Sequence, residues 1–221
     1  MSFVLHIDTA GQTASIAISA NETLLVEKLN ANQLDHASWI HCAIQEAMHE
    51  INLSLDKLDA VSVTIGPGSY TGLRVGLSTA KGLCFALEKP LITIPTLQLM
   101  ASVVECNIDS WICPMIDARR MEVYYALYDK SLHEIQPAQA LILDETSFRA
   151  ELEKQKIIFC GNGIDKFKPL TVSGNASFST ASATAKAMIP IALLKLVKKE
   201  FADLAYCTPL YVKEFYNGPK S

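Results

Sequence analysis

The two halves of the chain open with the same order of β-strand signals. Residues 3–29 hold three apolar, β-branched runs divided by the turn-like segments TAGQ and ANE, and residues 112–144 repeat this arrangement. In each half the first run ends in an acid directly before a hairpin, within Ile7-Asp8-Thr9 and Ile116-Asp117-Ala118. Antiparallel strands followed by crossover helices, twice over, favour an α/β protein with two mixed-sheet subdomains that arose by internal duplication.

Helical periodicity singles out two segments in the first half. Residues 36–51 carry apolar side chains at i, i+3, i+4 and i+7, and residues 72–87 follow a glycine-rich turn. We therefore place an N-terminal subdomain with these two helices at residues 1–108. The C-terminal subdomain is placed at residues 109–221 and includes a long helix near residues 183–203.

The composition is apolar for a chain without a membrane-spanning run. Half of the 221 residues are hydrophobic and 19% are charged. This excess indicates a sheet covered on both faces, or a surface buried against another protein. The net charge of −4 argues against binding nucleic acid over a wide basic face. Six scattered cysteines without a C-x-x-C pair, and an N-terminus without a signal peptide, predict a cytoplasmic protein.

The segment GPGSYTGLRVGLSTAKGL, from Gly66 to Leu83, resembles a phosphate-binding turn because it joins a strand to a helix. It lacks the Lys-Ser/Thr pair of a P-loop, the small sixth residue of a dinucleotide fingerprint and the G-x-S-x-G of a nucleophile elbow. The alternative is that Gly66 and Gly68 permit a tight turn.

The helix at residues 72–87 carries interior glycines, and each costs on the order of 1 kcal/mol relative to alanine. Close backbone approach to a neighbour is the usual reason. Only Arg74 and Lys81 are charged here, which indicates a helix covered on two sides by its own fold and by a partner protein. We expect Gly76→Leu to abolish pairing while the monomer stays folded. The predicted partner interface consists of Ile40, Ala43, Ile44, Ala47, Gly72, Val75, Gly76, Thr79 and Gly82.

Two acids and their neighbours are candidate contacts for a nucleotide or phosphate. Asp8 and Thr9 precede the first hairpin, and Asp117 and Arg119 flank the start of the second. Paired carboxylates can hold a Mg²⁺-nucleotide, but acids in these positions also commonly accept hydrogen bonds from turn N–H groups. No Ser-His-Asp, Cys-His or metal-ligand spacing is found, so we predict no catalytic and no metal-binding residues.

Three blocks together resemble the TsaB (YeaZ) family: IDTAGQTASIAI, GPGSYTGLRVGLSTAKGL and DARRMEVYYALY. The resemblance implies the duplicated actin/Hsp70-like ATPase fold, which is ribonuclease H-like, and a paralogous relation to TsaD. It also implies pairing with TsaD through two N-terminal helices, here residues 36–51 and 72–87, and a homodimer when the protein is alone. The closing segment CTPLYVKEFYNGPKS departs from the family pattern.

The function that the resemblance implies is a non-catalytic subunit of the complex that transfers threonylcarbamoyl to adenosine 37 of tRNA. Its expected partners are a TsaD-type catalytic subunit and a TsaE-type ATPase, with tRNA reached only through the complex and no membrane contact. No tightly bound cofactor is expected, and ATP with magnesium only within the complex. The alternatives are an ATP-binding enzyme that uses Asp8 and Asp117, and a peptidase that acts on the TsaD-type paralogue.

Overall fold

A computed structural model describes residues 1–32, 35–106 and 109–213. The chain forms two compact units. The first contains Met1–Val103 and Ser182–Pro209, and the second contains Val104–Ala181 together with the segment that starts at Leu210. The predicted boundary at residue 108 falls outside the described residues.

The first unit is built on a five-stranded sheet in the order β3-β2-β1-β4-β5. The first three strands pair antiparallel, whereas β4 and β5 continue the sheet in parallel, because helices connect them. The strands are β1 (Phe3–Asp8), β2 (Ala14–Ala20), β3 (Thr23–Asn30), β4 (Ala60–Thr64) and β5 (Leu91–Ile94).

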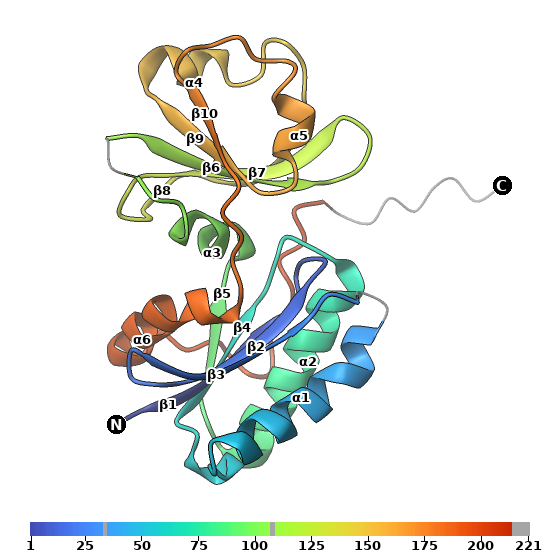
Figure 1. Ribbon diagram of the computed structural model, residues 1–221, viewed down its shortest axis with the longest axis vertical. Coiled ribbons are helices and arrows are strands. Elements are labelled where there is room, and N and C mark those ends of the chain that lie inside the picture. Colours follow the sequence, from blue (N-terminus) through green and yellow to red (C-terminus); the bar gives the residue numbers. More distant parts are fainter. Residues whose placement is uncertain (33–34, 107–108, 214–221) are drawn as a thin grey trace, which may run out of the picture. The chain divides into compact units, whose positions relative to one another are not determined.

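Helices cover both faces of this sheet, which accounts for the apolar composition (Figure 1). Leu5 and Ile7 of β1 pack in the cluster under α1 and α2, whereas Val4 of the same strand packs in the cluster under α6. The helices of this unit are α1 (His36–Glu50), η2 (Leu55–Lys57), α2 (Tyr70–Leu87), α3 (Thr96–Ser102), η3 (Ala185–Ala187) and α6 (Met188–Lys198). No helix among the described residues is long and apolar enough to cross a bilayer.

The position of α6 corrects the predicted C-terminal subdomain at residues 109–221. Met188, Ile191 and Ala192 of α6 are buried against strands of the first sheet, so residues 182–209 return to the first unit. The backbone N–H of Ala185 also donates to the hydroxyl of Ser15, at 2.8 Å. The apolar face of α6 completes the core that the first half leaves open.

The second unit repeats the topology of the first. Its sheet has the order β10-β9-β6-β7-β8, the same path read in reverse, with two antiparallel and two parallel pairings. This confirms the internal duplication. Its elements are β6 (Trp111–Asp117), β7 (Glu122–Tyr128), β8 (Glu134–Ile142), α4 (Arg149–Lys154), β9 (Ile157–Cys160), α5 (Ile164–Phe167) and β10 (Ala176–Ser179).

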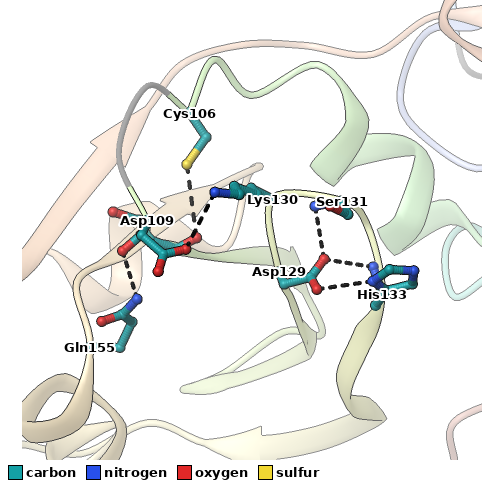
Figure 2. A network of polar contacts seen from close by, with 8 residues as sticks. Cys106, Asp109, Asp129, Lys130, Ser131, His133 and Gln155 are labelled. Atoms are coloured by element: carbon teal, nitrogen blue, oxygen red, sulfur yellow. Dashed lines mark hydrogen bonds and ion pairs between the residues drawn. The ribbon is translucent and has the colours of Figure 1, made fainter.

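A polar network ties two turns of the second unit together (Figure 2). The Asp129 carboxylate accepts the backbone N–H groups of Ser131, at 2.8 Å, and His133, at 2.9 Å, and pairs with the His133 ring. These bonds lower the pKa of Asp129, with the His133 N–H as the largest cause. Lys130 reaches the Asp109 carboxylate at 3.8 Å. Within the described residues, no group of three His, Cys, Asp or Glu side chains can hold a metal ion.

A histidine lies inside the first sheet, on β1. The ring of His6 is fully buried, with Nδ1 2.7 Å from the hydroxyl of Ser62 and Nε2 2.9 Å from that of Ser19. Burial lowers the pKa of His6 from 6.5 to about 3, because the charged ring has no water around it. The folded protein therefore holds this ring neutral.

We expect His6 to make folding stability fall as the solution is acidified. Between pH 6.5 and about 3 the unfolded chain binds a proton at His6 that the folded chain does not. The free energy of unfolding should therefore drop by up to about 1.4 kcal/mol per pH unit from this residue. Urea denaturation at pH 7.0, 5.5 and 4.5 measures the slope. His6→Gln, which cannot titrate, should show a shallower slope, and equal slopes would contradict the assignment.

Candidate functional site

The glycine loop between β4 and α2 packs against the hairpin that joins β1 to β2. The backbone N–H of Ser69 donates to the carbonyl of Ala10, at 2.8 Å, and a Cβ on Gly68 would lie 2.5 Å from the same oxygen. The Ser69 hydroxyl accepts the N–H of Gly72, at 3.2 Å, and caps α2. The N–H groups of Ser69 and Gly72 at this helix end are thus bonded within the chain, which agrees with the tight-turn alternative.

The glycines of α2 approach the same hairpin. A Cβ on Gly72 would overlap the carbonyl oxygen of Thr9, and one on Gly76 would overlap its hydroxyl. The buried Thr9 hydroxyl donates to the carbonyl of Gly72, at 2.7 Å. The sequence correctly indicates close backbone approach at these glycines, but the neighbour is the chain's own Thr9. This corrects the prediction that Gly72 and Gly76 lie in the partner interface.

Asp8 lies under the glycine loop at the end of β1. Its side chain accepts the Ala10 N–H, at 3.1 Å, and the Thr64 hydroxyl, at 2.8 Å. Burial raises the pKa of Asp8, while these two hydrogen bonds and the nearby His36 act in the opposite direction. His36 at the start of α1 is also buried, and its Nε2 has no hydrogen-bond partner among the described residues.

Asp117 occupies the equivalent position in the second unit but is exposed. Its carboxylate accepts the N–H of Arg119, at 2.6 Å, and pairs with Lys166 at 2.6 Å, which lowers the pKa of Asp117. Arg119 is exposed and adopts a positive φ of 70° in the tight turn. Both acids thus accept the N–H two residues further on, as the turn alternative expects. The two acids belong to separate units, and their role as nucleotide contacts stays a prediction.

Most of the other predicted interface residues are also buried in the first unit. Ile40, Ala43, Ile44 and Ala47 of α1 are at most 4% exposed, because they pack on the sheet and on α2. On α2, Thr79 is buried and Val75 packs against the same cluster. These residues hold the two helices in place and do not themselves form an open surface. Gly82 is the exception, since it is exposed and nothing lies within 4 Å of the position that a Cβ would occupy there.

The outer surface of the helix pair is formed by different side chains. We define the α2 ridge as Thr71, Arg74, Ser78, Gly82 and Phe85, which recur every three or four residues and are all exposed. Phe85 is 79% exposed, and the Arg74 guanidinium stacks over the Tyr70 ring at 3.9 Å. Phe85 is absent from the interface residues predicted from the sequence, although its spacing from Arg74 and Ser78 places it on the solvent side of α2.

The outer face of α1 is more polar than the ridge. A hollow of about 570 Å³ lies between α1 and β3, and an ion pair of 2.5 Å joins Lys28 to Glu50 at its edge. His41 and Cys42 extend the exposed face toward the start of α1. The hollow is lined by Lys28, Gln45, Glu46, His49 and Glu50. The pair therefore presents a ridge of three small residues, one arginine and one large aromatic residue, beside a polar helix.

Comparison with known proteins agrees with this architecture. The profile of the family described as "TsaD: tRNA N6-adenosine threonylcarbamoyltransferase" matches residues 29–214. The TsaB protein of Bacillus subtilis, named for tRNA threonylcarbamoyladenosine biosynthesis, is 28% identical over 216 residues, which cover 95% of this chain and 93% of that protein. TsaB of Escherichia coli is 33% identical over 128 residues, covering 58% of this chain and 55% of that protein.

A solved structure shares the whole fold. YeaZ from Pseudomonas aeruginosa aligns with a TM-score of 0.81 at 21% identity, over 96% of this chain and 100% of that one. The two mixed sheets and this likeness confirm the predicted duplicated actin/Hsp70-like, ribonuclease H-like fold. Since the family profile and the named relatives point the same way, the chain belongs to the TsaB (YeaZ) branch of the TsaD family.

Proposed function

We propose that this protein is a non-catalytic subunit of the complex that forms threonylcarbamoyladenosine at position 37 of tRNA, where it stabilises and activates a TsaD-type catalytic subunit. Family membership supports the process, because the named relatives are biosynthesis proteins for this modification. The observation that carries the subunit role is the exposed surface of the α1–α2 pair, where Phe85 lies on the same ridge as Ser78 and Gly82.

The ridge suits close packing by a helix of another protein. Ser78 and Gly82 leave the α2 backbone accessible, and a large exposed aromatic beside them can fill a partner pocket. The TsaD family profile covers both α1 and α2, so a TsaD-type subunit contains a related helix pair. Pairing of the two would place like elements against each other across a pseudo-twofold axis.

The remaining members of the assembly follow from the same proposal. A TsaE-type ATPase joins the pair, tRNA is reached only through the complex, and the ridge also supports a homodimer when the TsaD-type subunit is absent. ATP with magnesium acts within the complex, and the protein works in the cytoplasm. The Asp8 side chain accepts hydrogen bonds from the Ala10 N–H and the Thr64 hydroxyl, and these bonds support a role for the first unit that does not depend on nucleotide binding.

Gly82→Leu tests the partner surface. The new side chain points into open space in the monomer, so folding should be retained, and stability should rise slightly because leucine favours helix over glycine by up to about 1 kcal/mol. Across the interface it would keep the partner helix away. Titration against the purified TsaD-type subunit should show at least tenfold weaker binding, and undiminished affinity would refute this position for the interface.

Gly76→Ala is the matched change on the inward side of the same helix. The added methyl would collide with the Thr9 hydroxyl and disturb its bond to Gly72, so we expect a loss of about 1–3 kcal/mol in the free energy of unfolding. This replaces the expectation that Gly76→Leu leaves the monomer folded. Urea denaturation measures the loss. If the variant is as stable as the wild type, the Thr9 side chain moves aside without destabilising the fold, and the predicted loss is wrong.

Calorimetry of the isolated chain with ATP and magnesium separates the subunit from the alternative ATP-binding enzyme. We expect no micromolar binding, because the Asp8 side chain and the N–H of Gly72 are already bonded within the chain. A saturable signal that Asp8→Asn removes would favour the enzyme instead.

A further inference from the structure

The chain continues beyond α6 into a short segment that crosses to the α2 side of the sheet. We call residues 201–207 the C-terminal strap. The N–H of Ala202 donates to the carbonyl of Leu91 on the edge strand β5, at 2.8 Å. Leu204 and Cys207 then pack against the cluster beneath α1 and α2, whereas α6 packs on the opposite face. The strap thus passes round one edge of the sheet and reaches α2.

The strap forms a compact turn whose backbone groups are bonded. The Asp203 carboxylate accepts the N–H groups of Ala205, at 2.8 Å, and Tyr206, at 3.1 Å, and the Asp203 carbonyl accepts the N–H of Cys207, at 2.9 Å. From α2, the Lys81 ammonium donates to the carbonyls of Ala205, at 3.3 Å, and Cys207, at 3.1 Å. Lys81 therefore fastens this turn to the helix.

This fastening brings two exposed aromatic residues to the same side of the unit. Phe85 lies one helical turn beyond Lys81 on α2, and Tyr206 follows the carbonyl group that Lys81 holds. Phe85 is 79% exposed and Tyr206 is 84% exposed. Large aromatic side chains contribute most to protein interfaces when a partner buries them, and a side chain on a rigid turn loses little freedom on binding.

We propose that the C-terminal strap and the α2 ridge form one surface that binds the TsaD-type subunit. In this surface Phe85 and Tyr206 are the aromatic anchors, and Lys81 is the positioning residue for Tyr206. The inference rests on the proposed function and adds the strap, residues 201–207, to the surface that contacts the partner. The strap reaches α2 from the β5 edge of the sheet, whereas α1 lies over β2 and β3, so the strap widens the interface beyond the helix pair.

The chemistry of this surface fits a protein helix with an apolar face. Its two cations are already occupied, since Arg74 stacks on Tyr70 and Lys81 donates to the strap carbonyls. A phosphate backbone would require cations directed outward. Two aromatic rings beside Ser78 and Gly82 instead match an apolar helix that can approach closely.

Affinity measurements with the purified TsaD-type subunit test the surface. Tyr206→Ala and Phe85→Ala should each weaken binding at least tenfold and leave the melting temperature unchanged, because both side chains are exposed. Val197→Ala is the matched control: Val197 is 74% exposed, but it lies on α6 across the sheet, so binding should change less than twofold.

Lys81 is tested by combining variants. Lys81→Met keeps the apolar stem but removes the donors to the strap, and it should weaken binding about tenfold, whereas Lys81→Arg should restore most of the affinity. If Lys81 acts by placing Tyr206, the double variant Lys81→Met/Tyr206→Ala should bind as Tyr206→Ala does, within twofold. Additive losses would overturn the positioning role.

The outcomes separate this inference from the proposed function. Absence of binding by the wild-type chain would overturn both. Binding that Gly82→Leu abolishes but Tyr206→Ala leaves intact would overturn the strap surface alone, and the subunit role would stand. If Tyr206→Ala weakens only self-association, measured by sedimentation, the occupant is a second copy of the chain and the assignment to the TsaD-type subunit fails.

Discussion

The contact between Thr9 and the glycine face of α2 organises the first unit. Thr9 follows the first strand and its hydroxyl bonds to Gly72, while the absence of a side chain at Gly76 lets the helix lie against it. This contact fixes the rotation of α2 about its own axis. Since the inward side is occupied, Phe85 and Gly82 must face outward. The outward direction of the α2 ridge is therefore a consequence of how the hairpin and the helix meet.

The same contact determines what the carboxyl end of the sheet can do. Strand ends beside a glycine turn commonly receive phosphates in folds of this kind, because helix N–H groups point there. Here Ser69 and the carbonyl of Ala10 take up N–H groups at that end, and Asp8 bonds to Thr64 and to its own turn. A phosphate that bound these N–H groups, or a metal ion that bound Asp8, would have to replace hydrogen bonds that stabilise the fold.

The sequence predicts the elements well because their signals are local. The helices expected at residues 36–51 and 72–87 begin and end within two residues of α1 and α2, and the repeated strand order matches the two sheets. Leu73, Leu77, Ala80 and Cys84 face the sheet, as their spacing indicates.

The errors concern contacts between distant segments. The apolar pattern of residues 188–198 requires a cover but does not reveal which sheet supplies it, so the sequence places α6 in the wrong unit. Glycines signal close approach without naming the neighbour, which is why the pattern at Gly76 suggests a partner although the neighbour is Thr9. Tyr206 carries no periodic signal, because its place depends on the bonds of Lys81 to the strap.

The return of α6 to the first unit has a consequence for how the protein is made. Val4, Ala17 and Ile92 form a sheet face whose cover is encoded after residue 182. On the ribosome, this face stays uncovered while residues 104–181 of the second unit are synthesised. The core of the first-made half therefore depends on a segment made after most of the second unit, and a product that stops before residue 182 would expose that apolar face to solvent and to other nascent chains.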